Sequence, residues 1–259
     1  MLLIERDKVL RRRLLQRWVW LCLLIGWSSS SQANPAVVAS AANFRATLET
    51  LIEALSTRRP SAKFEVVSGS TGLLYAQIQA GAPFDLFFAA DAVSPEKLAK
   101  SGRSQGPAEV YAVGRLALWA PKNTLPWPIF LSDFKGTLAI ANPRLAPYGA
   151  AADAALQHNL FQGAPQRVQG NNVVHAFQFV ESGNAEAALL SLAQLRLAGV
   201  PNEAYQLVPE HYYPPIVQKR ILLTQHPDAR ALVAFMGSAD AQFILQEAGY
   251  LAPEDHSLL

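Results

Sequence analysis

The sequence predicts an α/β protein, because short β-rich runs alternate with helical patterns from about residue 36 to the end of the chain. Repeats, low-complexity segments and long linkers do not interrupt this alternation, which favours strand–helix–strand units and largely parallel sheets. Apolar residues make up 51% of the 259 positions, enough to bury a sizeable core in one large or two small domains.

Residues 1–33 have the composition of a cleaved secretory signal peptide. Arg11–Arg13 belong to a basic head, Trp18–Trp27 form a short apolar run, and Ser31–Ala33 end it with small residues. The alternative is a retained N-terminal anchor. A lipid anchor at Cys22 is disfavoured because Leu21 precedes it, and Cys22 is the only cysteine. Without the leader, 16 basic and 18 acidic side chains remain, so net charge gives no reason to expect nucleic acid as a partner.

The apolar spacing predicts strands and helices in turn. The expected strands are Ala36–Ala39, Phe64–Val67, Asp85–Ala89, Arg115–Ala120, Thr137–Ala141, Val168–Gln169, Ala187–Leu192 and Ile216–Leu223. The expected helices are Asn43–Thr57, Leu73–Ala80, Ser94–Ser101 with Pro95 at its first position, Ala150–Asn159, Val173–Glu181 and Ala229–Ala248.

Two segments are expected to cross between lobes: the apolar strand Arg115–Ala120, which ends at a proline, and the stretch Tyr212–Pro215, which two prolines stiffen. These crossings divide the chain into a first, discontinuous lobe of residues 34–114 and 217–259 and a second lobe of residues 115–216.

Four predicted strand-to-helix turns contain no Lys, Arg, Asp or Glu. They are Ser40–Asn43, Ser68–Gly72, Ala146–Gly149 and Gly170–Val173. Such turns lie at the carboxyl ends of strands and present the unpaired N–H groups and positive dipole of a helix start, where anions bind. For any single turn, ordinary helix capping by Ser or Asn explains the composition as well. Four uncharged turns in one chain favour a shared anion site.

A neutral site made only of donors suits a fully deprotonated tetrahedral dianion, which offers only acceptors. Protonated phosphate also requires an acceptor facing it, and the four turns contain no carboxylate. Sulfate and molybdate carry the same charge, so cavity size must separate them.

Several stretches carry a family resemblance. They are VVASAANF (37–44), VSGSTGLLYAQ (67–77), GAPFDLFFAAD (81–91), SPEKL (94–98), ANPRLAPYG (141–149), NNVVHA (171–176) and YYPPIVQ (212–218). In order and spacing they resemble the periplasmic molybdate-binding proteins (ModA) of ABC importers, across nearly the whole chain after the leader. The resemblance implies a type II periplasmic-binding-protein fold: two lobes, each with a central mixed β-sheet flanked by helices, and a ligand cleft between them.

The resemblance also implies a function and a ligand site. We expect a periplasmic monomer that binds molybdate or tungstate, performs no catalysis, needs no cofactor and passes its ligand to an ABC permease in the inner membrane. The implied ligand-binding residues are Ala42, Asn43, Ser70, Thr71, Tyr148 and Val173, the last through its backbone N–H. At Ala42, where relatives often have a hydroxyl, only the backbone N–H remains. Ser191 stands where some members have a tyrosine.

Other functions are kept open. A second binding hypothesis replaces the metal oxyanion with sulfate, thiosulfate or a phosphonate, and it keeps the fold and the lobes and differs only in the cavity. An enzyme would use Ser68 or Ser70 as a nucleophile, but that turn lacks the G-x-S-x-G pattern. A sensor that docks on a membrane partner is compatible with a leader. Among single residues, His175 is expected on a helix surface, Asp91 as a cap, and Trp119, Trp127, Tyr212 and Tyr213 in packing.

Overall fold

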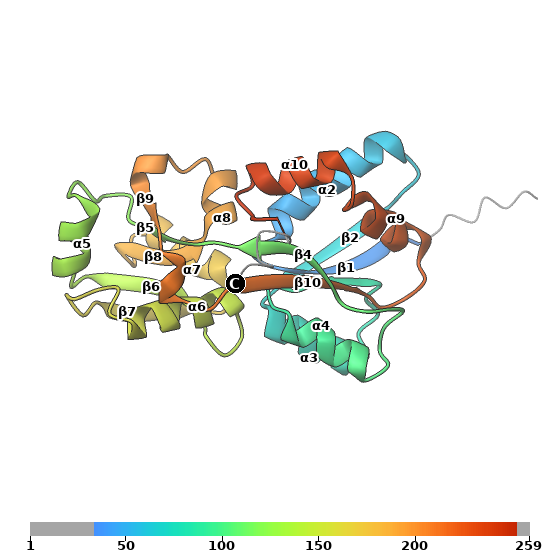
Figure 1. Ribbon diagram of the computed structural model, residues 1–259, viewed down its shortest axis with the longest axis horizontal. Coiled ribbons are helices and arrows are strands. Elements are labelled where there is room, and N and C mark those ends of the chain that lie inside the picture. Colours follow the sequence, from blue (N-terminus) through green and yellow to red (C-terminus); the bar gives the residue numbers. More distant parts are fainter. Residues whose placement is uncertain (1–33, 253–259) are drawn as a thin grey trace, which may run out of the picture. The chain divides into compact units, whose positions relative to one another are not determined.

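The structure, a computed structural model, describes residues 34–252. The expected signal peptide, with Cys22, lies outside these residues. Residues 35–252 belong to one compact unit, which contains two five-stranded sheets (Figure 1). In the described residues, no helix is long and apolar enough to cross a membrane.

The first sheet has the order β2-β1-β3-β10-β4. Its strands are β1 (Ala36–Ala41), β2 (Phe64–Gly69), β3 (Leu86–Phe88), β4 (Glu109–Gly114) and β10 (Ile216–Leu222). β1 pairs in parallel with β2 and β3, whereas β10 is antiparallel to both β3 and β4.

Helices cover both faces of this sheet. α2 (Arg45–Arg58), α9 (Pro227–Phe235) and α10 (Ala239–Glu247) lie on one face, and α3 (Thr71–Gln79) and α4 (Val93–Lys100) on the other (Figure 1). The burial of β3 shows why both faces need helices. Leu86 and Phe88 join the core under α2, and Phe87 between them joins the core under α3. Successive strand residues face opposite sides, so a strand apolar at every position needs cover on both.

The second sheet repeats this plan with the order β7-β6-β8-β5-β9, in which β5 is the antiparallel strand. Its strands are β5 (Leu116–Trp119), β6 (Thr137–Ala141), β7 (Gln166–Gly170), β8 (Ala187–Ser191) and β9 (Tyr205–Leu207). The helices in this half are α5 (Trp127–Asp133), α6 (Pro147–Gln157), α7 (Val173–Glu181), α8 (Leu192–Leu197) and the 3₁₀ turns η1 (Asn202–Ala204) and η2 (Glu210–Tyr212).

The chain passes from the first sheet to the second between β4 and β5 and returns between β9 and β10. The two passages are tied together, because the Leu116 N–H donates to the hydroxyl of Tyr213 (3.1 Å). Tyr213 is buried, in agreement with its expected packing role.

Three expectations need correction. The sheets are mixed, with two parallel and two antiparallel strand pairs each, which confirms the mixed sheets that the family resemblance implied and corrects the largely parallel sheets expected from the alternation of strands and helices. The expected helix Ala229–Ala248 is two helices, because α9 ends before Gly237 and Ser238 caps α10 by accepting from the Ala241 N–H. α4 begins at Val93, so Pro95 is its third residue.

Candidate functional site

A small cavity lies where the two halves of the protein meet. Residues 41–43, 69–71 and 90 line it from the first half, and residues 146–148, 172 and 173 from the second. All six residues expected to bind ligand are among them: Ala42, Asn43, Ser70, Thr71, Tyr148 and Val173. Each of the 12 lining residues is uncharged. The volume is about 10 Å³, comparable to a single water site, so the turns approach one another closely.

Ser70 presents an unpaired hydroxyl at the start of α3. Serine at a helix N-cap ordinarily accepts from its own helix, but Ser70 makes no capping bond. Its Oγ is buried without a partner, and the residue is only 3% exposed. Buried polar atoms are rarely left unpaired. The expectation of mere capping is therefore wrong at this position, and the hydroxyl is available to an occupant of the cavity.

Thr71, by contrast, already uses its hydroxyl within the protein. Its Oγ1 accepts from the Ala90 N–H (3.0 Å), which ties the second turn to the end of β3. As the first residue of α3, its own backbone N–H has no intrahelical acceptor. The hydroxyl of Thr71 thus shapes the turn, and its N–H adds a donor.

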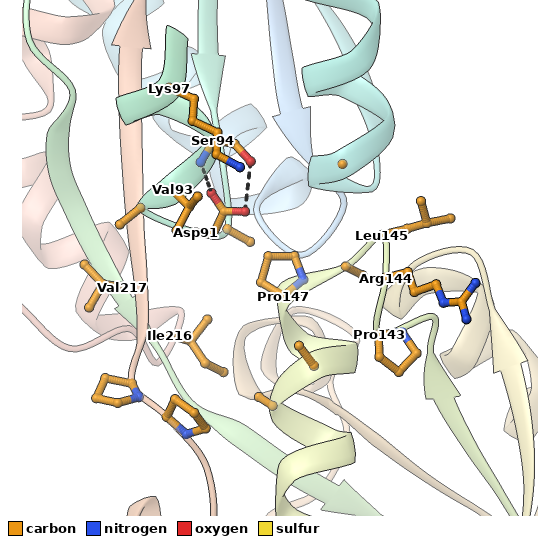
Figure 2. Close-up of a pocket in the computed structure, with 18 residues that line it drawn as sticks. Asp91, Val93, Ser94, Lys97, Pro143, Arg144, Leu145, Pro147, Ile216 and Val217 are labelled. Carbon is orange, nitrogen blue, oxygen red and sulfur yellow. Dashed lines mark hydrogen bonds between the residues drawn. The ribbon is translucent and has the colours of Figure 1, made fainter. Parts of the chain in front are cut away.

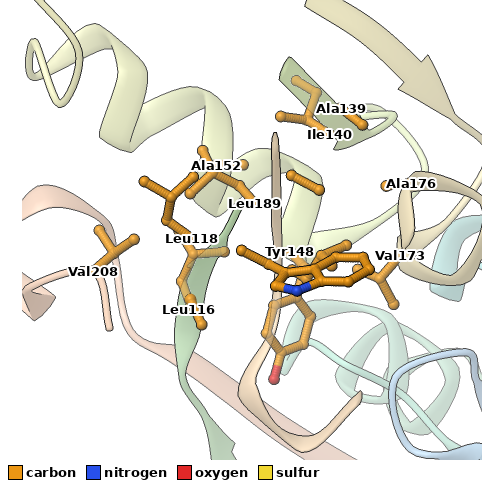
Figure 3. Packing of buried hydrophobic residues seen from close by; sticks show 14 of the residues in the cluster. Leu116, Leu118, Ala139, Ile140, Tyr148, Ala152, Val173, Ala176, Leu189 and Val208 are labelled. Atoms are coloured by element: carbon orange, nitrogen blue, oxygen red, sulfur yellow. The ribbon is translucent and has the colours of Figure 1, made fainter. Parts of the chain in front are cut away.

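Tyr148 is the second residue of α6, after Pro147, and is 2% exposed. Figure 3 shows it beside Val173, with the hydroxyl directed away from the apolar residues Leu116 and Leu118. The hydroxyl accepts from Gln218 Nε2 (3.2 Å). Burial raises the pKa of Tyr148 well above its ordinary value, with a further rise from Tyr250, so the hydroxyl keeps its proton and acts as a donor.

Asn43 lines the cavity as expected, but its side-chain amide is not free to donate to a ligand. Both hydrogens of its amide are committed, one to Gln218 Oε1 (3.0 Å) and the other to the hydroxyl of Tyr250 (3.2 Å). The N–H of the neighbouring Ala42 donates to the Gly69 carbonyl (2.9 Å). The expected side-chain donor of Asn43 and backbone donor of Ala42 are therefore already paired inside the protein, which leaves the Asn43 backbone N–H to face the cavity.

The fourth turn combines a cap with a free donor. Asn172 caps α7 by accepting from the His175 N–H (3.1 Å), as the capping interpretation predicted. Val173, the first residue of α7, is buried at the cavity, and its N–H has no acceptor within the helix. His175 is exposed on the helix surface, as expected. Ser191 is absent from the cavity lining and instead caps α8 by accepting from the Gln194 N–H.

The starts of α3, α6 and α7 therefore converge on one cavity. Each directs the positive end of its dipole at the cavity, Thr71 and Val173 supply backbone N–H groups without an intrahelical acceptor, and Ser70 and Tyr148 add hydroxyls. Pro147, the first residue of α6, has no N–H to contribute. The arrangement is electropositive without any formal charge, and it offers donors to a compact anion.

A larger pocket of about 560 Å³ adjoins this cavity, with Ala90, Ala146 and Pro147 common to both. It contains a carboxylate, Asp91, which accepts from the backbone N–H and the hydroxyl of Ser94 (2.8 and 3.0 Å; Figure 2). Asp91 thus caps α4, as predicted. Lys97 and Arg144 also line the larger pocket, so it mixes charges of both signs, whereas the smaller cavity is lined by uncharged residues of all four turns and is the candidate anion site. Within residues 34–252 no cluster of His, Cys, Asp or Glu is arranged to hold a metal ion.

Sequence reasoning missed the polar residues behind the cavity. Gln218 of β10 is fully buried and bonds Asn43, Tyr148 and Tyr111, the last at 2.9 Å. The only available signal was a glutamine in an otherwise apolar strand pattern beside the paired prolines.

Two mixed sheets joined by two crossings, with a donor-lined cavity where the two halves meet, are the arrangement of a solute-binding protein. A model of the bacterial extracellular solute-binding proteins matches residues 36–251, and the chain belongs to that family.

Within the family, its relatives are ModA proteins. The chain is 37% identical over 237 residues to the molybdate-binding protein ModA of Azotobacter vinelandii, covering 85% of this chain and 91% of that one. It is 32% identical over 239 residues to the ModA of Rhodobacter capsulatus, covering 89% and 94%. The solved periplasmic molybdate-binding protein of Azotobacter vinelandii superposes with a TM-score of 0.75 at 33% identity, covering 84% and 99%. The chain is a member of the ModA proteins.

Proposed function

We propose that this protein captures molybdate or tungstate in the cavity between its two halves and delivers the anion to an ABC permease in the inner membrane. The observation that carries the proposal is the lining of the cavity: 12 uncharged residues, with donors supplied from both halves. The molybdate-binding relatives support the choice of anion.

The donor set suits a fully deprotonated tetrahedral dianion. If six to eight charge-assisted hydrogen bonds each contribute about 1.5–3 kcal/mol gross, the total is ample. Ordering and desolvation reduce it to about −8 to −12 kcal/mol, the range of a micromolar to nanomolar binder. A protonated phosphate or phosphonate would need a carboxylate facing its O–H, and the cavity has none among its lining residues.

The proposed mechanism is hinge closure of two lobes, residues 34–114 with 217–259 and residues 115–216. The anion bridges donors from both lobes, and the permease recognises the closed form. The bond between Leu116 and Tyr213 holds the two crossing segments together, which suits a hinge.

A binding role is preferred over an enzyme because no histidine, aspartate or glutamate lines the cavity to activate Ser70. We further propose that residues 1–33 are a cleaved leader, that the protein works in the periplasm as a monomer, and that it requires no cofactor.

Calorimetry on ligand-stripped protein tests the proposal, with molybdate, tungstate, sulfate and phosphate titrated in turn. We expect molybdate or tungstate to bind with a dissociation constant in the micromolar to nanomolar range, sulfate more weakly, and phosphate not measurably. If sulfate binds as tightly as molybdate, the assignment of molybdate or tungstate as the substrate is wrong.

A further inference from the structure

A chain of buried hydrogen bonds leads from the backbone of Asn43 to the hydroxyl of Tyr148. Tyr250 donates its hydroxyl proton to the Asn43 carbonyl (3.0 Å) and accepts from the Asn43 amide (3.2 Å). The second amide hydrogen of Asn43 goes to Gln218 Oε1 (3.0 Å), and Gln218 Nε2 donates to the Tyr148 hydroxyl (3.2 Å). Asn43, Gln218, Tyr148 and Tyr250 are each at most 4% exposed, so water does not compete with these bonds.

Each bond in this chain fixes the direction of the next. Because the Tyr250 proton is used by a carbonyl, its oxygen can only accept from Asn43. The amide of Asn43 then requires an acceptor, which holds Gln218 with Oε1 towards Asn43 and Nε2 towards Tyr148. The Tyr111 hydroxyl lies 2.9 Å from the same Oε1 and 3.2 Å from the Ala89 carbonyl, so its one proton is shared between these two acceptors. A flipped Gln218 amide would place donor against donor.

The consequence falls on Tyr148, whose oxygen receives a hydrogen bond and whose own proton has no acceptor among the described residues. Tyr148 also lines the donor cavity. We propose that Gln218 is a positioning residue that fixes the Tyr148 hydroxyl as a donor to the bound anion. The inference rests on the proposed function. It assigns part of the site's preference for fully deprotonated anions to Gln218, which does not line the cavity.

Through this role, Gln218 keeps the Tyr148 hydroxyl a donor, so the hydroxyl does not become an acceptor for a protonated ligand. A free tyrosine hydroxyl can rotate and accept a hydrogen bond from the O–H of a ligand such as hydrogen phosphate. With Gln218 Nε2 on its lone pair, Tyr148 has less freedom to do so. The buried amide therefore acts on specificity as well as on affinity.

A double-mutant cycle measures whether Gln218 acts through the hydroxyl. Gln218→Met retains length and removes both hydrogen-bonding groups, and Tyr148→Phe removes the hydroxyl. We expect Gln218→Met to weaken molybdate binding about tenfold or more in the otherwise unaltered protein, but less than about threefold in the Tyr148→Phe background. Gln206→Met, at a half-buried glutamine of β9 away from the cavity, is the matched control and should leave affinity unchanged.

A second variant separates positioning from packing. Gln218→Glu has the same shape, but its carboxylate only accepts, so the Tyr148 proton should turn away from the anion. When protonated, the same carboxyl again offers one donor and one acceptor. The carboxylate also repels the anion directly, and that part of the effect persists in the Tyr148→Phe background. The rise in the dissociation constant that Gln218→Glu causes, from about threefold at pH 5 to more than about tenfold at pH 8, should therefore be smaller in the Tyr148→Phe background. The titratable or charged groups around this position are Tyr111, Tyr148, Tyr213, Tyr250, Asp91 and Arg220.

The outcomes separate this inference from the proposed function. If the unaltered protein binds none of the oxyanions, the proposed function fails and the inference fails with it. If molybdate binds but the effect of Gln218→Met, or the pH-dependent effect of Gln218→Glu, is the same with and without the Tyr148 hydroxyl, only the inference is overturned. Thermal unfolding of each ligand-free variant verifies that it is folded.

Discussion

The Gly72 N–H donates to the Leu145 carbonyl (2.9 Å), which joins the start of α3 to the segment before α6. A Cβ on Gly72 would lie 3.2 Å from that oxygen and 3.3 Å from the Leu145 Cα. Because both neighbours are backbone atoms, they have little room to yield. The two halves thus meet beside the cavity at a contact that accepts only glycine without displacement.

Replacing Gly72 with alanine should therefore oppose closure. We expect Gly72→Ala to weaken oxyanion binding by about 1–3 kcal/mol, the usual range for overpacking. The ligand-free protein should be equally stable or up to about 1 kcal/mol more stable, since alanine favours a helix. Calorimetry and thermal unfolding measure the two effects. Gly237→Ala, whose Cβ meets nothing closer than 3.6 Å, should change neither.

Ser70 and Thr71 should respond in opposite ways. Ser70→Ala removes a buried hydroxyl that has no partner, so stability of the ligand-free protein should hold or rise, while affinity falls by about 1.5–3 kcal/mol. Thr71→Val leaves the Ala90 N–H unpaired, so stability should fall by about 1–3 kcal/mol. A loss of stability in Ser70→Ala would show that its hydroxyl has a structural partner instead.

Tyr148→Phe should lower molybdate affinity by about 1–3 kcal/mol, because it removes one hydrogen bond to a charged group. The matched control is Tyr75→Phe in α3, whose hydroxyl accepts from Gln79 Nε2 (2.8 Å) outside the cavity lining. Calorimetry under identical buffer conditions compares the two. Equal affinity in Tyr148→Phe and the unaltered protein would place the anion elsewhere.

Gly114 provides the space that Tyr148 and Gln218 occupy. A Cβ there would lie 2.1 Å from the Tyr148 hydroxyl and 2.7 Å from Gln218 Nε2. We expect Gly114→Ala to displace both side chains, weakening binding about tenfold or more and destabilising the fold by about 1–3 kcal/mol. Gly136→Ala would place a Cβ 2.8 Å from the Phe134 ring, a milder overlap outside the cavity, and should lower stability without changing affinity.

Much of the fold follows from local pattern. Helix α7 and strand β6 have the predicted bounds, because caps, apolar periodicity and the burial of short apolar runs act within a few residues. Strands β4 and β9 and helix α5 were not predicted. β9 has only three residues, too few for any periodicity, and it exists because β5 lies beside it.

The candidate site was likewise only partly predictable from the sequence. The cavity-lining positions could be chosen from uncharged turns and the family resemblance, since each turn is a local feature. The sequence could not show whether each donor is free or is already hydrogen-bonded within the protein. Whether Asn43 points its amide at a ligand depends on Gln218 and Tyr250, which are 175 and 207 positions away in the sequence. Such contacts arise only once the chain has crossed between sheets twice.

Anomalous diffraction from crystals grown with tungstate is the most direct test of the central claim. We predict one strong tungsten peak in the cavity, placed so that the tungstate oxygens accept hydrogen bonds from the Ser70 and Tyr148 hydroxyls and the Val173 N–H, with no charged side chain in contact. A peak elsewhere, or a lysine or arginine bonded to the anion, would contradict it.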